Sequence, residues 1–307
     1  MKKFIKSIVL FTLLNLLVGE IIVRKFYLTT DIPRRQINSD GIQNYRPGQT
    51  GFWKGGAHSW VINELGWAGC LPDKKDNLIT LIGDSYIENF MNPQECHQCA
   101  FLQNKTSKYN FLEAARSGVS LIEALEISKQ CDEFTPVYQL IYVNDKDFEE
   151  SISDIKVLND ITQINLKNNE LSFGEMKSPK LKSILYNWKL LYYFYLRFNS
   201  GSNNNDTKII NSKDYQKPDH ITKIKELLVS IKKLYIVENK ILVFHPNSNK
   251  KIIQEVVNLG YKTIVLDSSK DTKSWSFEFD SHWTCYGHQE SAQQVYDELV
   301  KKYGVTN

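Results

Sequence analysis

Short apolar runs recur along this chain after residue 77, and they limit its possible folds more than any other part of the sequence. Each run is mostly apolar and does not alternate regularly with polar residues, which is typical of strands buried on both faces of a parallel sheet. Because helical patterns lie between the runs, the sequence predicts a three-layer α/β/α fold around a mainly parallel, five-stranded sheet. The predicted strands cover residues 78–82, 109–112, 139–143, 241–244 and 263–266.

The clearest predicted helix lies at the C-terminal end, where apolar residues recur at the spacing of one helix face. Lys301, Lys302 and Gly304 follow and predict the end of this helix. The apolar stripe consists of Ala292, Val295, Tyr296, Leu299 and Val300.

The rest of the chain divides by composition. Residues 28–77 are rich in Gly, Asn, Trp and Pro and predict an irregular, β-rich lead-in to the α/β domain of residues 78–307. Within that domain, residues 147–219 exceed a minimal fold and predict an insertion over the C-terminal edge of the sheet. The insertion contains a possible hairpin around Asn168 and Asn169 and a polar linker at 200–208. Its aromatic-rich helix at 185–198 is expected to pack against the domain core.

The first 27 residues resemble an export signal. Lys2, Lys3 and Lys6 precede an apolar run at 8–23, and a helix of that length spans about 24 Å, close to a hydrocarbon core of about 30 Å. A cleaved signal peptide is the alternative, but no A-x-A-like cleavage site follows. We therefore expect an uncleaved transmembrane anchor with the body of the protein exported.

Composition excludes some partners. With 38 basic against 35 acidic residues, the net charge is only +3, so nucleic-acid binding is not expected. Only six of the basic residues are Arg, which usually dominates bidentate phosphate recognition.

A candidate nucleophile follows the first predicted strand, which runs into Gly83, Asp84 and Ser85. A Ser between a strand end and a helix start is exposed, with its own N–H and the helix dipole beside it. Such a Ser can attack a carbonyl, although the three residues also suit an ordinary capped turn.

A candidate base and acid precede the C-terminal helix. If this segment is extended, Asp280 and His282 point to the same side, so Asp280 can accept a hydrogen bond from one imidazole nitrogen. The other nitrogen is then free to take a proton from Ser85. A surface loop with a capping Asp is the alternative interpretation.

Two further residues follow predicted strands and can reach the same cleft. Gly118 lets its backbone N–H approach a ligand closely, and the Asn144 amide is a neutral donor suited to an oxyanion. Each alone is also compatible with a plain turn.

Together, these four segments resemble those of the SGNH (GDSL-type) hydrolase superfamily. They occur in the family's order over roughly residues 60–303. The lead-in INELGWAG and the segment LLVGEIIVRKF are similar to membrane-anchored bacterial members associated with surface polysaccharides.

The resemblance implies a flavodoxin-like sheet with Ser85 as nucleophile, His282 as base and Asp280 as the acid that orients it. It also implies an oxyanion hole made by the N–H groups of Ser85 and Gly118 and the side chain of Asn144. No cofactor or metal is expected. The chain departs from the common pattern in having one residue, not two, between acid and base, and in the bulky YIENF that starts at Tyr86.

The five cysteines leave several alternatives open. Cys96 and Cys99 have metal-ligand spacing, but a zinc site would need Cys70, Cys131, Cys285 or His288 to converge on them. In an exported protein, one or two disulfides with a leftover thiol are the simpler expectation. The pairing is not predicted. We expect the remaining histidines, His58, His97, His220 and His245, to be structural or surface residues.

Three functions fit this sequence. The first is a serine esterase that removes acyl groups, acetyl above all, from a surface carbohydrate. The second is an O-acyltransferase that uses the same triad and a sugar hydroxyl in place of water. The third, a non-catalytic glycan-binding protein, is disfavoured because all the catalytic residue types are present.

Overall fold

The computed structural model describes residues 1–199 and 218–306. Its centre is a five-stranded sheet of order β11-β10-β7-β5-β6, and all neighbouring strands in it are parallel. The five predicted strands are all present, each within one residue of its expected ends except β6, which ends three residues later than predicted. They are β5 (Leu78–Gly83), β6 (Asn110–Ala115), β7 (Tyr138–Val143), β10 (Lys240–Phe244) and β11 (Lys262–Val265).

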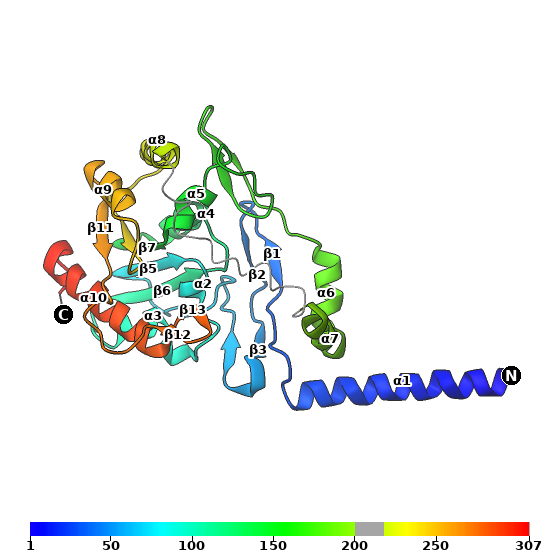
Figure 1. Cartoon of the computed structure of the whole chain (residues 1–307). Helices are drawn as coiled ribbons and strands as arrows, with labels where there is room; N and C mark the ends of the chain where they lie inside the picture. The colour runs from blue at the N-terminus through cyan, green and yellow to red at the C-terminus, as the bar shows by residue number, and fades with distance from the viewer. Residues whose placement is uncertain (200–217, 307) are drawn as a thin grey trace.

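Helices cover both faces of the sheet, which confirms the three-layer fold (Figure 1). One face packs against α4 (Leu121–Cys131), α5 (Asp145–Glu150), α8 (Pro218–Leu234) and α9 (Lys250–Asn258). The other face packs against α3 (Gln98–Gln103) and α10 (Cys285–Tyr303). The apolar residues of β5, β7 and β10 are buried because both faces of these strands meet a helix layer, whereas Val265 of the edge strand β11 is 47% exposed.

Helix α10 is the predicted C-terminal helix, and it ends where the sequence indicates. Gly304 adopts a left-handed conformation with φ of 72°, and its N–H bonds to the Leu299 carbonyl. Ala292, Val295 and Leu299 are fully buried, whereas Val300 lies at the edge of the stripe and is 43% exposed.

The lead-in forms two small antiparallel hairpins. Strand β1 (Arg35–Ile37) pairs with β2 (Gln43–Tyr45), and β3 (Thr50–Phe52) pairs with β4 (Ser59–Val61) around a short 3-10 turn, η1 (Lys54–Gly56). Tyr45, Trp60 and Ile62 form a separate small core with Ala68. The lead-in is thus attached to the side of the sheet domain near β6, where Ala68 bridges Ala115.

The insertion contains the hairpin expected around Asn168 and Asn169, formed by β8 (Gln163–Asn165) and β9 (Glu170–Ser172). Two helices follow, α6 (Pro179–Asn187) and α7 (Lys189–Asn199). The predicted linker at 200–208 lies outside the described residues.

The aromatic-rich helix differs from the expectation that it packs against the domain core. Tyr192 is buried, but Leu191 and Phe194 are each 44% exposed and Phe198 is 77% exposed. Its apolar spacing is that of an amphipathic helix, and spacing alone does not tell whether the apolar face meets protein or another apolar medium.

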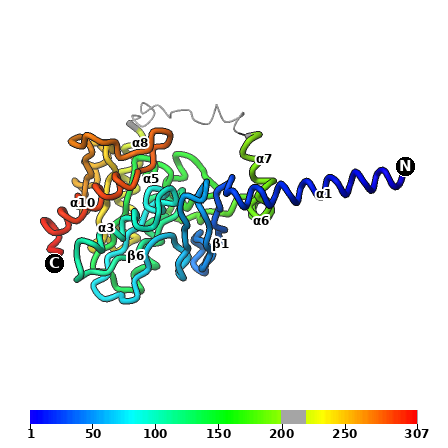
Figure 2. The backbone as a smooth tube through the Cα atoms, turned by 90° about the horizontal axis from the view of Figure 1, so that it is seen from below, coloured from blue at the N-terminus to red at the C-terminus, as the bar shows by residue number. Residues whose placement is uncertain are grey.

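Helix α1 (Lys2–Lys25) extends away from the body of the protein, and among the described residues only its last turns contact other parts of the chain (Figure 2). By length and composition it can cross a membrane, with a mean hydropathy of 2.0 over its most apolar window. A signal sequence meets the same criterion.

Four of the five cysteines form disulfides, and Cys131 is free and buried. Cys70 pairs with Cys99, and Cys96 in the 3-10 turn η2 (Gln94–Cys96) pairs with Cys285 at the start of α10. The sulfur atoms of the C-x-x-C segment, Cys96 and Cys99, are therefore in disulfides and do not serve as metal ligands.

Candidate active site

Ser85 lies where the central strand β5 turns into the short helix α2 (Ser85–Glu88). The turn is tight because Gly83 has no side chain: a Cβ there would lie 2.7 Å from Ile87 Cγ1. Asp84 caps the helix by accepting from the Tyr86 N–H at 3.0 Å. Ser85 is half-buried as a result, with its hydroxyl at the carboxyl end of the sheet, where such folds place ligands.

Ser85, His282 and Asp280 form a continuous chain of hydrogen bonds. The Ser85 Oγ lies 2.7 Å from His282 Nε2, and His282 Nδ1 contacts Asp280 Oδ1. With its Nδ1–H donated to the carboxylate, the imidazole presents the lone pair of Nε2 to the Ser85 hydroxyl. In this arrangement the imidazole can act as a general base toward Ser85.

A hairpin holds the acid and the base. Strand β13 (Asp280–Trp283) pairs with β12 (Ser276–Phe277), so the segment is extended, and residues 280 and 282 point the same way. Asp280 also accepts from the backbone N–H of His282 at 2.9 Å. Partial burial raises the pKa of Asp280, but these two hydrogen bonds from His282 outweigh it, so its pKa lies below the usual range and the carboxylate stays charged.

Aromatic rings hold the imidazole in place. The Tyr86 ring lies 4.8 Å from the His282 ring, and it also contacts Trp283 and His245. His245 follows β10 and is buried. Burial, with the nearby charge of His282 in second place, lowers its pKa to about 3. His245 is therefore neutral and serves as packing beside the site, as expected of a structural histidine.

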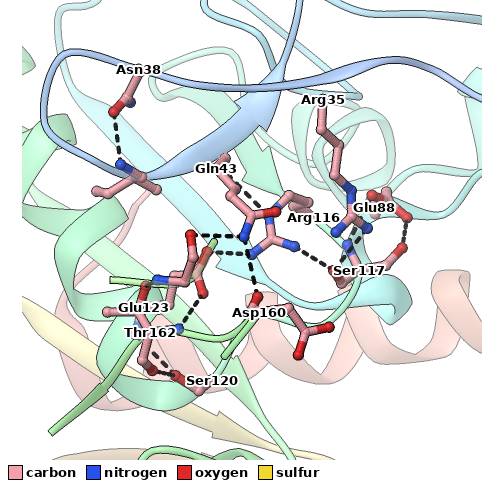
Figure 3. Close-up of polar contacts among 12 residues, drawn as sticks. Arg35, Asn38, Gln43, Glu88, Arg116, Ser117, Ser120, Glu123, Asp160 and Thr162 are labelled. Carbon is pink, nitrogen blue, oxygen red and sulfur yellow. Dashed lines mark hydrogen bonds and ion pairs between the residues drawn. The ribbon is translucent and has the colours of Figure 1, made fainter. Parts of the chain in front are cut away.

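The turn after β6 carries Gly118, whose φ of 76° favours glycine. The preceding residue, Ser117, lines the cleft, and each of its polar atoms has a hydrogen-bond partner (Figure 3). Its N–H and hydroxyl donate to Glu88, with an N to Oε1 distance of 2.9 Å. Its carbonyl accepts from Arg35 at 3.1 Å and Arg116 at 2.7 Å.

This fixed carbonyl also sets the direction of the Gly118 N–H. In a trans peptide, the C=O of Ser117 and the N–H of Gly118 point in opposite directions within one plane. Because two guanidinium groups hold the carbonyl, the Gly118 N–H faces away from them. Among residues 1–199 and 218–306, neither this N–H nor that of Ser85 has an acceptor, so both are available to an oxyanion.

A buried ion pair ties this turn to the lead-in and to the insertion (Figure 3). Arg116 contacts Glu123 of α4, and both side chains are almost fully buried. Arg116 Nε donates to the Gln43 carbonyl at 3.0 Å, and Glu123 accepts from the Thr162 N–H at 3.1 Å. The three parts of the chain that surround the cleft are thus joined at one point.

The side chain of Asn144, the predicted third oxyanion donor, already has hydrogen-bond partners within the protein. Its Nδ2 donates to Asp84 at 3.0 Å and to Asp147 at 3.2 Å, and its Oδ1 caps α5 by accepting from Lys146. An amide nitrogen has two hydrogens, and the two carboxylates take up both. A bond from Asn144 to an oxyanion would therefore compete with these carboxylates.

Asp84 and Asp147 are both buried, and burial is the main cause of their raised pKa values. The pKa of Asp84 is raised to about 6. The pKa of Asp147 is raised well above its usual range, with the charge of Asp84 as a second cause. The pattern Gly-Asp-Ser indicated Asp84 only as part of a turn, and nothing local in the sequence shows that it shares a donor with Asp147.

The triad opens into a cleft of about 520 Å³. One wall comes from the lead-in and another from the insertion, which brings residues far apart in sequence to the same site. The cleft is lined by aromatic rings and by charged side chains of both signs. They include Tyr45, Trp53, Phe90 and Tyr186, with Arg34, Arg35, Arg46, Asp31, Glu175 and Lys182.

The described ranges contain no group of three or more His, Cys, Asp or Glu side chains placed to hold a metal ion. Glu88, Arg35 and Arg116 are the residues near the site that sequence reasoning missed. Glu88 lies one helical turn after Ser85, and that spacing is the only local signal that could have indicated it.

No protein-family model matches the sequence, and no curated protein matches it. Several solved structures are similar to this chain over most of its length. One is a putative lipolytic protein of the G-D-S-L family from Desulfitobacterium hafniense, at 10% identity, with 72% of this chain and 99% of that chain covered and a TM-score of 0.36.

Two others are a family two carbohydrate esterase and a putative GDSL-like lipase. The esterase, from Clostridium thermocellum in complex with cellohexaose, has 12% identity, covers 78% of this chain and 68% of its own, and has a TM-score of 0.39. The lipase, from Bacteroides ovatus, has 11% identity, 74% and 99% coverage and a TM-score of 0.36. The matched proteins are of the type that the motifs resemble, but the likeness is distant, and the functional assignment depends on the geometry of the site.

Proposed function

We propose that this chain is a serine ester hydrolase of the SGNH type that acts on acyl esters, acetyl above all, of a surface carbohydrate. The observation that supports this proposal most directly is the chain of hydrogen bonds from Ser85 through His282 to Asp280. It joins a nucleophile, a base and an orienting carboxylate at the mouth of one cleft.

In the acylation step, Ser85 Oγ attacks the ester carbonyl carbon while His282 Nε2 takes the hydroxyl proton. Asp280 stabilises the imidazolium through its hydrogen bond to Nδ1. The N–H groups of Ser85 and Gly118 stabilise the oxyanion, with Asn144 as a proposed third donor. The tetrahedral intermediate then expels the sugar oxygen, which takes the proton from Nε2 and leaves the acyl group on Ser85.

In the second step, His282 removes a proton from water, which attacks the acyl-enzyme and releases the carboxylic acid and free Ser85. A sugar hydroxyl in place of water would give acyl transfer, the alternative activity.

The lining of the cleft supports a carbohydrate substrate. Aromatic faces provide apolar contact for sugar rings, and charged and amide side chains provide partners for hydroxyl groups. Tyr45, Trp53 and Tyr186 supply the first kind of contact, and Arg34 and Asp31 the second.

We propose that α1 anchors the protein in a membrane with the catalytic body on the exported side. The three lysines before the apolar run and the body after it support this orientation. The two disulfides support it too, because such bonds persist in oxidising compartments outside the cytoplasm.

The activity is tested by incubating the full chain with an activated acetyl ester, with and without an oligosaccharide, and measuring free acetate and acetylated sugar. Free acetate in both incubations supports the hydrolase, and acetylated sugar would establish the transferase instead. Ser85→Ala should lower turnover by at least about 10³-fold, as loss of a triad member does elsewhere. Ser59→Ala, on the exposed strand β4, is the matched control. Unchanged turnover in Ser85→Ala would refute the assignment.

The location is tested by protease treatment of intact spheroplasts that express the protein, with sequencing of its mature N-terminus. Digestion of the catalytic body supports the exported orientation, and protection would contradict it. A mature N-terminus near Glu20 would mean a cleaved signal peptide.

A further inference from the structure

Helices α6 and α7 carry an unusually large exposed apolar surface. Within each helix its residues recur every three or four positions, so they lie on one side of that helix, and Trp188 lies between the two helices. We call this surface the α6–α7 face. It consists of Leu181, Ile184, Trp188, Leu191, Phe194 and Phe198, which are between 44% and 77% exposed. A patch of this kind on a protein normally marks a contact surface.

Helices α6 and α7 lie beside the end of α1 (Figures 1 and 2). The carboxylate of Glu20 accepts from the backbone N–H groups of Lys189 at 3.1 Å and Leu190 at 2.7 Å, and so caps the first turn of α7. A Cβ at Gly19 would lie 2.9 Å from Leu190 Cδ2. The position of α7 is therefore set by the last turns of α1.

We propose that the α6–α7 face lies in the headgroup and upper acyl region of the bilayer that α1 crosses. This proposal rests on the membrane anchoring proposed above. Along α1, the apolar residues from Phe4 to Ile22 are exposed and need an apolar medium, and the last turn with Arg24 and Lys25 would lie at the interface. Because α7 packs against Gly19 and Glu20, just before that turn, we place its apolar side at about the same depth.

The composition of the face is that of interfacial helices. Trp188, Tyr193 and Tyr195 are amphipathic rings of the kind enriched at membrane surfaces, and Lys180 and Arg197 are exposed cations beside them. The patch is continuous with a lipid-facing helix, and this favours lipid over a second copy of the chain.

The opposite side of α6 lines the catalytic cleft through Lys182, Ser183 and Tyr186. One helix therefore separates the cleft from the proposed lipid contact, a distance of about 10 Å. The active site would act on esters held close to the membrane surface, such as those of a glycan still attached to the membrane.

The test is photo-crosslinking of the full chain in nanodiscs of phosphatidylcholine and phosphatidylglycerol. A benzophenone amino acid replaces Phe194 or Phe198, and mass spectrometry identifies the adducts. Leu10 in α1 is the positive control, and Val257, which is 47% exposed on α9, is the matched control. Labelling of Ser85 by a fluorophosphonate checks that each variant is folded.

We expect lipid adducts at positions 10, 194 and 198 and none at position 257. Lipid adducts at 10 but none at 194 and 198 would overturn the proposal and leave the anchor in place. Adducts of 194 or 198 with a second copy of the chain would also overturn it. If position 10 forms no lipid adduct, the anchoring proposal fails and this one fails with it. Turnover of a soluble ester is measured separately, so a missing esterase activity is distinguishable from both results.

Discussion

In the proposed mechanism, the reactivity of Ser85 depends on which nitrogen of His282 carries the proton. Asp280 accepts two hydrogen bonds from His282, one from its ring and one from its backbone, so it fixes both the tautomer and the position of the imidazole. Having one residue between acid and base, not two, makes this double contact possible, because both lie on one side of the strand β13.

The role of Asn144 can be separated into two measurable parts. If Asn144 is an oxyanion donor, the change Asn144→Ala should lower turnover by on the order of 10²–10³-fold. If its amide stabilises Asp84 and Asp147, the same change should lower the unfolding free energy by about 1–3 kcal/mol. We expect Asn144→Ala to show both losses in ester turnover and in urea unfolding.

Asn249→Ala is the control for this variant, because Asn249 caps α9 as Asn144 caps α5 but lies outside the cleft. A stability loss in Asn144→Ala with less than about threefold loss of turnover would contradict the oxyanion role.

Asp84 predicts a pH dependence of stability. Burial raises its pKa from 3.8 to about 6, so between these values the folded protein keeps a proton that the unfolded chain has released. Stability therefore falls as the pH rises through this window. In Asp84→Asn the fall should be smaller, as measured by urea unfolding at several pH values. Asp76→Asn, on the surface, should follow the wild type; an equal slope in all three proteins would contradict the assignment.

At the scale of elements, the site is held together by the contact between α2 and the turn after β6. Glu88, at the end of α2, binds the N–H and the hydroxyl of Ser117, and Tyr45 of β2 donates to the same carboxylate. Ser85 and the Gly118 N–H are thus on two elements that one buried carboxylate joins.

Glu88→Gln should weaken the contact between α2 and the turn after β6 without leaving a cavity there. The amide keeps the volume but has one acceptor oxygen, and hydrogen bonds to charged groups contribute about 1.5–3 kcal/mol. We expect kcat to fall about 10-fold or more, with KM nearly unchanged, because a donor to the transition state loses its alignment. Glu95→Gln, on the exposed turn η2, is the control. An unchanged kcat, with or without a rise in KM, would argue against a positioning role.

At the scale of the whole molecule, the Cys96–Cys285 disulfide joins positions 189 residues apart. Cys285 begins α10 directly after the strand that carries His282, so the bond attaches the catalytic hairpin to the segment beyond α2. Such a long closed loop restricts the unfolded chain strongly.

Replacing Cys96 and Cys285 together by Ser should lower the unfolding free energy by about 2–5 kcal/mol. Urea unfolding and ester turnover measure the effect, and turnover should fall with stability because the hairpin loses its attachment. Cys131→Ser, which removes the free buried thiol, controls for the loss of a thiol itself. Equal stability of the double variant and the wild type would contradict this role.

The sequence by itself determined the strands of the sheet and the local geometry of the candidate catalytic residues. The five strands are mostly apolar runs, and a stable arrangement has to bury both faces of the central ones. Ser85 and the Asp280–His282 pair follow from local geometry, since a strand-to-helix turn exposes a Ser and an extended segment aligns alternate side chains.

Only the tertiary structure decided the contacts that depend on which segments meet. The cysteine pairing, the donors around Asn144 and the Arg116–Glu123 ion pair join residues whose sequence positions carry no sign of their proximity. The surroundings of the aromatic-rich helix were likewise decided only by the tertiary structure. Its apolar stripe has the spacing of a core helix, but α7 is packed against α1 through Glu20, and the stripe is left exposed. Periodicity specifies that a face must leave water, and only the packed structure specifies what that face meets.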